Sequence, residues 1–184
     1  MIAIQTDALL RREDTLLLVV DAQERLLPAL HDSARALANV QRLVAFAAQI
    51  GVPVEYTEQE NLGPTAAVLR ALWGGAEPVV KREFDALSNA ALAARLAGRE
   101  RRCLLLAGFE AHICVAQTAL HASEHFAVQV VADAVASRDP ENRLLALDRL
   151  RAAGVTVTST EMVIYELLRQ AGTDEFRAAL PLVK

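Results

Sequence analysis

Short apolar segments alternate with longer segments of helical periodicity along the chain, and no other feature of the sequence limits the possible folds as strongly. The segment TLLLVVD at residues 15–21 is apolar up to its last residue, as expected for a strand buried on both faces. Strand-like segments occur at residues 15–21, 52–57, 78–84, 103–109, 127–134 and 155–160. This alternation predicts a three-layer α/β/α fold, in which helices cover both faces of a six-stranded, mainly parallel sheet.

The segments between the predicted strands carry residues that commonly begin and end helices. Ser33, Thr65 and Ser88 are suitable N-caps, and Cys114 stands where another helix is expected to begin. Pro140 suits the first turn of a helix. The predicted helices are residues 33–51, 65–73, 88–98, 114–124, 140–154 and 160–172. The C-terminal segment TDEFRAALPLVK is predicted to add one short helical turn.

Length and composition indicate the class of protein. The 184 residues predict one domain, residues 1–184, of which 53% are hydrophobic. A net charge of −4 and an aromatic content of 4% argue against a nucleic-acid partner, which needs a basic surface or aromatic side chains that stack on bases. No apolar run reaches the ~18 residues that span a bilayer, so no membrane association is predicted.

The N-terminus and the cysteines bear on cellular location. The N-terminal segment MIAIQTDALLRRED lacks the basic start, the long apolar core and the cleavage site of a signal peptide. Cys103 and Cys114 are too few for a disulfide framework and do not have a metal-binding spacing. A reducing, cytoplasmic location is therefore predicted.

Three chemically capable side chains follow different predicted strands. Asp21 ends the first strand, Lys81 lies at or just past the third, and Cys114 follows the fourth after a short loop. In open parallel sheets, ligands bind beyond the carboxyl ends of the strands. Right-handed crossover connections can bring those ends to one edge of the sheet. The sequence therefore predicts that Asp21, Lys81 and Cys114 meet at a common site.

These three residue types together can carry out acyl transfer. A helix N-terminus and a nearby ammonium both favour the thiolate form of a cysteine. A carboxylate can accept the thiol proton and later pass it to a leaving group, while backbone N–H groups before the helix hold the oxyanion. Each residue also has a structural interpretation: Asp21 as a turn or cap residue, Lys81 as a solvated charge, and Cys114 as small packing.

Five segments of the chain resemble the isochorismatase-like hydrolase superfamily, also called the cysteine hydrolases. They are LLLVVDAQERLLPAL, VPVEYTEQENLGPT, VVKREFDAL, GFEAHICVAQTAL and VVADAVASRDPENRLLALDRLRAAGVTVTSTEMVIYELL, and they cover nearly the whole chain. The chain most resembles the isochorismatase domain-containing subgroup, whose members are poorly defined in substrate. The resemblance implies the isochorismatase-like hydrolase fold.

The resemblance also implies roles for particular residues. Asp21 would be the proton acceptor, Lys81 its electrostatic partner and Cys114 the nucleophile. A cis peptide bond between Phe109 and Glu110 is implied, and it would aim the backbone N–H groups of Glu110 and Cys114 at one point as an oxyanion hole. The implied activity is hydrolysis of a small amide, or of a related C–N or ester bond, through a thioester-type intermediate.

The segment after the second predicted strand departs from the metal-dependent nicotinamidases of this superfamily. Those members bind a metal through an Asp-x-His pair and further histidines, whereas YTEQENLGP contains no histidine. His121 and His125 stand one helical turn apart, but a lone pair with this spacing is more often surface or packing than a metal site. We therefore predict no metal and no cofactor.

True isochorismatases lack the cysteine, so Cys114 argues against vinyl-ether cleavage.

Further residues near the predicted strand ends are candidates for lining a substrate pocket. These candidates are Gln23, Glu58, Gln59, Phe84 and His112. Structural alternatives are a loop amide for Gln23, core packing for Phe84 and an exposed loop histidine for His112.

Glu110 and Arg138 have expected roles beside the cysteine loop. Glu110 is expected to anchor that loop by hydrogen bonds rather than to react. For Arg138 two roles stay open: it binds a substrate carboxylate, or, with slight preference, it pairs with an acid across a subunit interface. Cys103 lies at the opposite end of its strand and is expected to serve as buried packing.

The preferred hypothesis is a Cys114-dependent hydrolase that acts on a small-molecule substrate and forms a homo-oligomer. The alternative is a catalytically weak or inactive binding or scaffold protein of the same fold. A third hypothesis, a nucleotide-binding protein with a doubly wound sheet, is disfavoured because VVDAQERLLPAL has no glycine where a phosphate-binding loop would lie.

Overall fold

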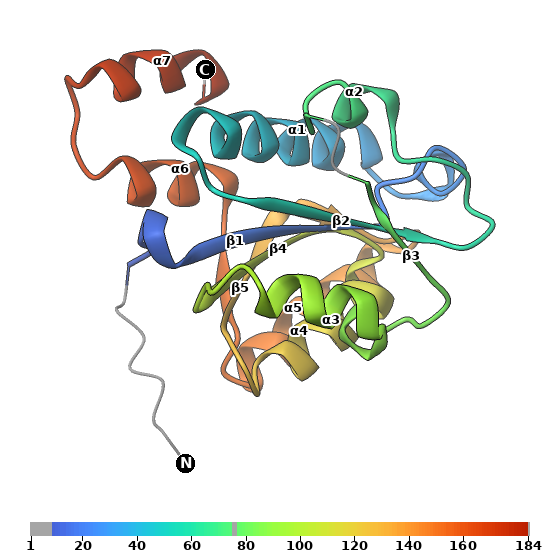
Figure 1. Cartoon of the computed structure of the whole chain (residues 1–184). Coiled ribbons are helices and arrows are strands. Elements are labelled where there is room, and N and C mark those ends of the chain that lie inside the picture. The colour runs from blue at the N-terminus through green and yellow to red at the C-terminus, as the bar shows by residue number, and fades with distance from the viewer. Residues whose placement is uncertain (1–8, 75–76, 184) are drawn as a thin grey trace.

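The sheet at the centre of the fold is fully parallel. The structure, a computed structural model, describes residues 9–74 and 77–183. Within these residues, six strands follow the order β3-β2-β1-β4-β5-β6, and every neighbouring pair is parallel (Figure 1). The strands are β1 Thr15–Val20, β2 Val54–Gln59, β3 Val79–Lys81, β4 Cys103–Phe109, β5 Ala127–Ala136 and β6 Thr156–Thr158. The predicted three-layer fold with a six-stranded sheet is confirmed.

Helices cover both faces of this sheet. One face carries α1, α6, α7 and the single-turn α2, and the other carries α3, α4 and α5 (Figure 1). The helices are α1 Ser33–Ile50, α2 Ala67–Arg70, α3 Ala90–Ala97, α4 Ala116–Ala122, α5 Pro140–Ala152, α6 Thr160–Leu168 and α7 Asp174–Val183. None of these helices, within the described part of the chain, is both long enough and apolar enough to cross a bilayer.

The strand β1 shows why the centre of such a sheet needs a continuous apolar run. Its side chains alternate between two cores: Leu17 and Val19 face the α1 side, whereas Leu16 and Leu18 face the α3 side. All residues of β1 are buried. A polar residue at positions 16–20 would therefore face an apolar core on either side, and the first polar residue after this run is Asp21, just beyond the strand.

The helix caps differ from those predicted. Helix α1 begins at Ser33 itself, and its N-cap position is Asp32. Asn89 caps α3, because its side-chain oxygen accepts hydrogen bonds from two backbone N–H groups of that helix. Thr65 does not cap α2 and instead donates to Glu58. The predictions of Ser33, Thr65 and Ser88 as caps are therefore wrong.

The C-terminal segment also forms more helix than predicted. A ten-residue helix, α7, replaces the expected single turn. Phe176, Ala179 and Leu182 recur at three-residue spacing and pack against the core on the α1 side. This contact with the core stabilises a segment that would be marginal as an isolated helix.

Gly108 allows β4 to approach β1 near the carboxyl ends of both strands. Its φ is +116°, and a Cβ atom added there would lie 2.0 Å from the backbone oxygen of Val20. The pairing of β4 with β5 also shifts register between Leu106 and Gly108. Because the strand order reverses between β1 and β4, this is the edge at which a parallel sheet of this topology binds ligands.

Candidate active site

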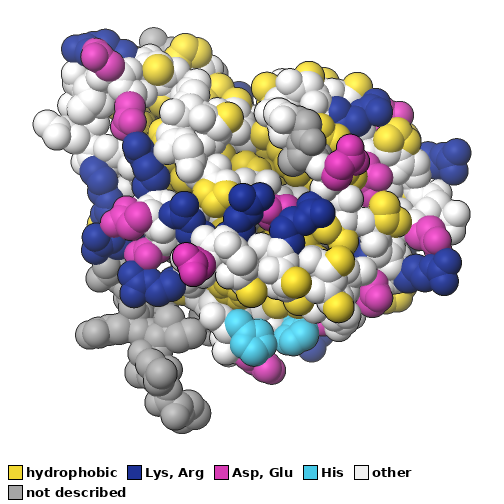
Figure 2. Space-filling model, viewed as in Figure 1, with side chains coloured by type: hydrophobic (Ala, Val, Ile, Leu, Met, Phe, Trp, Pro, Cys, Tyr) yellow, Lys and Arg dark blue, Asp and Glu magenta, His cyan; other side chains and the backbone are white. Residues whose placement is uncertain are grey.

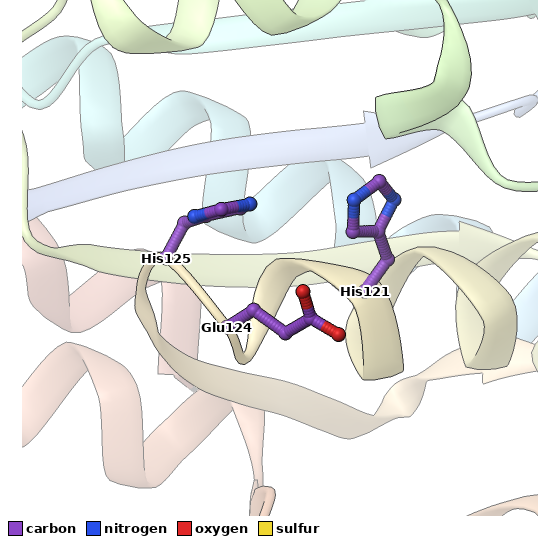
Figure 3. A group of neighbouring side chains, drawn as sticks. All are labelled: His121, Glu124 and His125. Atoms are coloured by element: carbon purple, nitrogen blue, oxygen red, sulfur yellow. The ribbon is translucent and has the colours of Figure 1, made fainter. Parts of the chain in front are cut away.

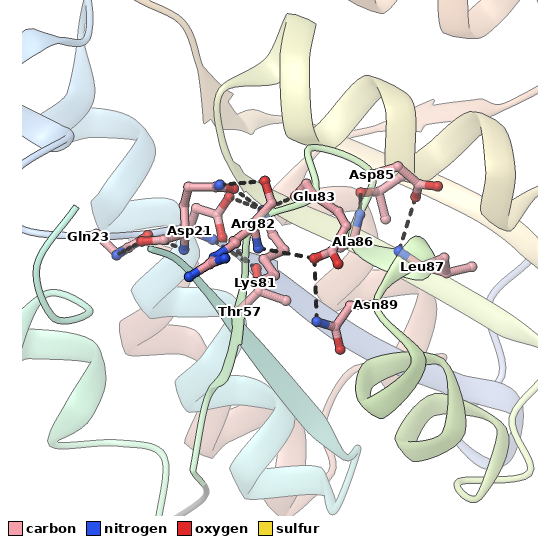
Figure 4. A network of polar contacts seen from close by, with 12 residues as sticks. Asp21, Gln23, Thr57, Lys81, Arg82, Glu83, Asp85, Ala86, Leu87 and Asn89 are labelled. Carbon is pink, nitrogen blue, oxygen red and sulfur yellow. Dashed lines mark hydrogen bonds and ion pairs between the residues drawn. The ribbon is translucent and has the colours of Figure 1, made fainter. Parts of the chain in front are cut away.

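Asp21 and Lys81 form a buried ion pair at this edge. The Nζ atom of Lys81 lies 2.7 Å from Oδ2 of Asp21, and both side chains are almost completely buried (Figure 4). The same ammonium donates to Oε1 of Gln59 at 2.7 Å and to the carbonyl oxygen of Glu83 at 3.1 Å. An ammonium has three protons, so these three acceptors use all of them.

Thr57 supports the other side of the Asp21 carboxylate. Its hydroxyl donates to Oδ1 of Asp21 at 2.7 Å, and the backbone N–H of Asp21 donates to the carbonyl oxygen of Thr57 at 3.2 Å. Asp21 itself has a φ of 48°, which is uncommon for a residue other than glycine. Thr57 is not among the predicted site residues, although its hydroxyl lies inside the second predicted strand, 52–57. The residue after β1 and residues of β2 and β3 thus form a continuous network.

We expect Thr57→Val to destabilise the protein by about 1–2 kcal/mol, because it removes a buried hydrogen bond to Asp21 while preserving shape. Thr158→Val is the matched control, since the buried Thr158 hydroxyl has no partner among the described residues. That change is expected to be neutral or stabilising. Urea denaturation of both variants measures the difference, and an equal effect of the two changes would contradict the assigned role of Thr57.

Cys114 lies in a tight turn between β4 and α4. Residues Ala111–Val115 form one π-helical turn, and the carbonyl oxygen of Glu110 accepts hydrogen bonds from the N–H groups of Ile113 and Val115, each at 3.2 Å. The α-helix begins only at Ala116, so the prediction that Cys114 begins this helix is wrong by two residues. The peptide bond between Phe109 and Glu110 is cis, as predicted.

The Cys114 thiol is close to both members of the ion pair. It is 7% exposed, and hydrogen-bonding and charge interactions with Asp21 and Lys81 act on it. The pKa of the Cys114 thiol is raised to about 12, chiefly by burial and next by the Asp21 carboxylate, although the Lys81 ammonium acts to lower it. The Lys81 ammonium favours the thiolate as predicted, but the net shift of the Cys114 pKa is upward, so the resting site does not hold a thiolate. Loss of hydration and the nearby carboxylate outweigh the ammonium.

Cys103 provides a comparison within the same chain. It opens β4 at the opposite end of the strand from the site, and burial raises the pKa of its thiol to about 12 as well. Both cysteines are free thiols. The two residues therefore differ in their neighbours rather than in acidity: only Cys114 has a carboxylate and an ammonium of a buried ion pair beside it.

Glu110 anchors the cysteine turn to the loop after β5. Its carboxylate accepts from the backbone N–H of Arg138 at 2.9 Å and from the Nε of Arg138 at 3.2 Å. Arg138 thus pairs with an acid of its own chain. The imidazole of His112 lies 2.9 Å from the Ser137 hydroxyl, so a second residue of the cysteine turn contacts the loop after β5. These contacts fix the position of the turn that carries Cys114.

The remaining pocket candidates fall into two groups. Gln23 bonds to backbone atoms of Gln59 and Gly63, and Glu58 accepts from Thr65, so both brace the loop after β2. Gln59 is the exception among the three polar candidates, because its side chain contacts Lys81 directly. Phe84 is 55% exposed and follows the same strand as Lys81. The structure therefore brings Gln59 to the ion pair, and it assigns Gln23 and Glu58 to loop support.

Known proteins resemble this chain in sequence and in fold. A family model described as the isochorismatase domain matches residues 15–162. Isochorismatase domain-containing protein 2 of Danio rerio is 33% identical over 171 residues, which cover 91% of this chain and 86% of that protein. YcaC from Pseudomonas aeruginosa, solved with hexane-2,5-diol and covalent acrylamide, is 27% identical with a TM-score of 0.89, covering 96% of this chain and 92% of that chain. YcaC from Escherichia coli is described as an octameric hydrolase of unknown specificity. It is 28% identical with a TM-score of 0.89, and the match covers 97% of this chain and 90% of that chain.

Proposed function

Because the chain belongs to the isochorismatase family, we propose that it hydrolyses a small amide, or a related C–N or ester bond, through a covalent intermediate on Cys114. The observation that carries this proposal is the buried ion pair of Asp21 and Lys81 beside the Cys114 thiol. These groups are a nucleophile, a proton acceptor and a fixed positive charge. A buried ion pair is costly to form unless it is well bonded, so its retention beside a thiol supports a chemical role.

The first half of the proposed reaction begins with a neutral thiol. As the Cys114 sulfur attacks the substrate carbonyl carbon, the thiol proton moves to the Asp21 carboxylate. The carbonyl oxygen becomes an oxyanion, which the backbone N–H groups of Glu110 and Cys114 stabilise. The C–N bond then breaks, and the leaving amine takes the proton from Asp21. The acyl group remains on Cys114 as a thioester.

The second half releases the acyl group to water. Asp21 accepts a proton from the attacking water molecule and returns it to the Cys114 sulfur as the thioester bond breaks. Lys81 and Thr57 bind one carboxylate oxygen of Asp21 each, so they hold the orientation of this carboxylate in both halves. The raised pKa of Cys114 is compatible with this sequence of steps, because the thiol loses its proton only during attack.

Acrylamide adds to nucleophiles through its C=C bond and keeps its amide, so the covalent acrylamide on the similar Pseudomonas aeruginosa protein supports the nucleophile of this proposal but not the amide cleavage. We expect acid-quenched mixtures of this chain with a panel of small amides and esters to contain an acyl adduct that intact-mass measurement detects and peptide mapping places on Cys114. Cys103→Ala is the matched control and is expected to form the same adduct. An acyl group mapped to Cys103 would contradict the proposal.

A second function, binding without turnover, is favoured by one observation. The pKa of Cys114 is raised rather than lowered, and Cys103, far from the site, shows the same direction. Under this alternative, Asp21, Lys81 and Cys114 form a pocket that binds a small molecule. If Cys114→Ala binds the small molecule as tightly as the original chain does, and the original chain forms no acyl adduct, the protein binds without turnover.

The proposal extends to assembly and location. We place the protein in the cytoplasm, acting on a small-molecule substrate as a homo-oligomer. The octameric Escherichia coli relative supports assembly. Apolar side chains exposed on α5 and α6 support it too, because contact between subunits would bury them. These side chains are Leu144, Leu145, Met162 and Tyr165.

A further inference from the structure

A second group of polar side chains lies away from the ion pair, where α4 ends and the chain turns toward β5. His121, Glu124 and His125 each offer one ligand atom, and these atoms all lie within 4.8 Å of one another. Figure 3 shows the three side chains as neighbours at the end of α4, with the Glu124 carboxylate below the two imidazole rings. Glu124 and His125 are exposed, and histidine side chains gather at one edge of the surface in Figure 2. A dissolved ion can therefore reach this group.

Asp85 fixes which nitrogen of His121 is available. Its Oδ2 atom lies 2.6 Å from Nδ1 of His121, and a carboxylate can only accept, so Nδ1 carries the proton. In the neutral imidazole, Nε2 then has the lone pair and can bind a cation. A carboxylate behind a histidine is the usual second partner of metal-binding histidines, because it sets the tautomer and raises the basicity of the ligating nitrogen.

Asp85 is itself held in place. It accepts hydrogen bonds from the backbone N–H of Leu87 and from the hydroxyl of Ser88. The next residue, Ala86, donates its backbone N–H to the hydroxyl of Thr118, which lies on α4 three residues before His121. The turn at residues 85–88 and the end of α4 are therefore joined at two points. This arrangement keeps the Asp85–His121 pair ordered before any ligand arrives.

We propose that His121, Glu124 and His125 form a surface site for a divalent transition-metal ion such as Zn²⁺. Two imidazole nitrogens and one carboxylate oxygen are ligands that suit Zn²⁺, and three protein ligands leave a fourth position for water. Ligand atoms around a tetrahedral Zn²⁺ ion lie roughly 3.4 Å apart at the usual bond lengths. Small rotations of the exposed side chains bring atoms that are within 4.8 Å of one another to that spacing.

This proposal reverses the expectation from the sequence. The spacing of His121 and His125 alone favoured surface or packing roles. The structure adds Glu124 as a third ligand and Asp85 as a partner that fixes the tautomer. The proposal does not depend on the Cys114 chemistry, since Lys81 donates to Asp21, Gln59 and Glu83 and not to any of these residues.

The test is a calorimetric titration of the full chain with Zn²⁺ after treatment with a chelator. We expect one ion per chain with a Kd on the order of 10 µM or tighter. His125→Gln and Glu124→Gln are each expected to weaken binding at least about tenfold, and Asp85→Asn about 10–100-fold. Zn²⁺ should also raise the melting temperature of the original chain but not that of His125→Gln.

His31→Gln and Cys114→Ala are the matched controls, because the first removes an imidazole elsewhere and the second removes the thiol at the ion pair. Both are expected to bind Zn²⁺ as tightly as the original chain. Melting without metal checks that each variant is folded. The proposal is overturned if the original chain does not bind Zn²⁺ in this range, or if Glu124→Gln and His125→Gln leave the affinity unchanged.

Discussion

Cys114→Ala is expected to lower kcat/KM by at least about 10³-fold for any amide or ester that the chain hydrolyses. The variant keeps Asp21, Lys81 and the backbone around the site but lacks the atom that accepts the acyl group. Because burial raises the pKa of Cys114 to about 12, the thiol is protonated throughout the neutral range. The loss is therefore expected at every pH from about 6 to 9. Steady-state kinetics with a compound that forms the acyl adduct on Cys114 would measure it.

Cys103→Ala separates this chemical loss from a loss of packing. It removes the same sulfur atom from an equally buried position at the other end of β4. Both variants are expected to lose about 1 kcal/mol of folding stability, but only Cys114→Ala should lose activity. A Cys114→Ala protein that turns over substrate as fast as Cys103→Ala would eliminate the covalent mechanism.

Gly108→Ala is expected to destabilise the protein by about 4 kcal/mol or more. The added Cβ atom would meet backbone atoms of Val20, with the oxygen 2.0 Å away, and a backbone cannot rotate aside as a flexible side chain can. Overpacking of this kind and a φ of +116° each cost about 1–3 kcal/mol. Separation of β1 from β4 would also displace Asp21. Denaturant titration at fixed temperature measures the stability change.

Gly51→Ala is the control for the effect of a positive φ alone. Gly51 ends α1 with a φ of +71°, and nothing lies within 4 Å of a Cβ atom built there. We expect a cost of only about 1 kcal/mol at this position. If Gly108→Ala proved no more destabilising than Gly51→Ala, the close approach of β1 and β4 would not be an important constraint on this fold.

The central strands could be predicted from the sequence because burial on both faces demands an unbroken apolar run. The predicted segment 103–109 coincides with β4, and β1 ends one residue before the predicted limit. The edge strand β3 has only three residues, Val79–Lys81, instead of the predicted seven. An edge strand has one neighbour, and β3 pairs with β2 only over those residues. Its length depends on that contact rather than on local composition.

Part of the site could also be predicted, since chemically capable residues at strand ends are visible in a sequence. Asp21, Lys81 and Cys114 do come together. The contact between Gln59 and Lys81 depends on the register of β2 against β3, in which these two residues are partners. The direction of the Cys114 pKa shift depends on how deeply the thiol is buried. Neither register nor burial depth can be obtained from spacing along the chain.

The Lys81 ammonium has no proton left for an incoming molecule, since its three N–H groups already donate to oxygen atoms of this chain. An anionic compound would gain no direct cationic contact there unless it displaced Gln59 or Glu83. An electroneutral compound requires no such exchange. A direct hydrogen bond from Lys81 to a ligand therefore requires the loss of one of these three bonds, whereas selection by size and shape does not.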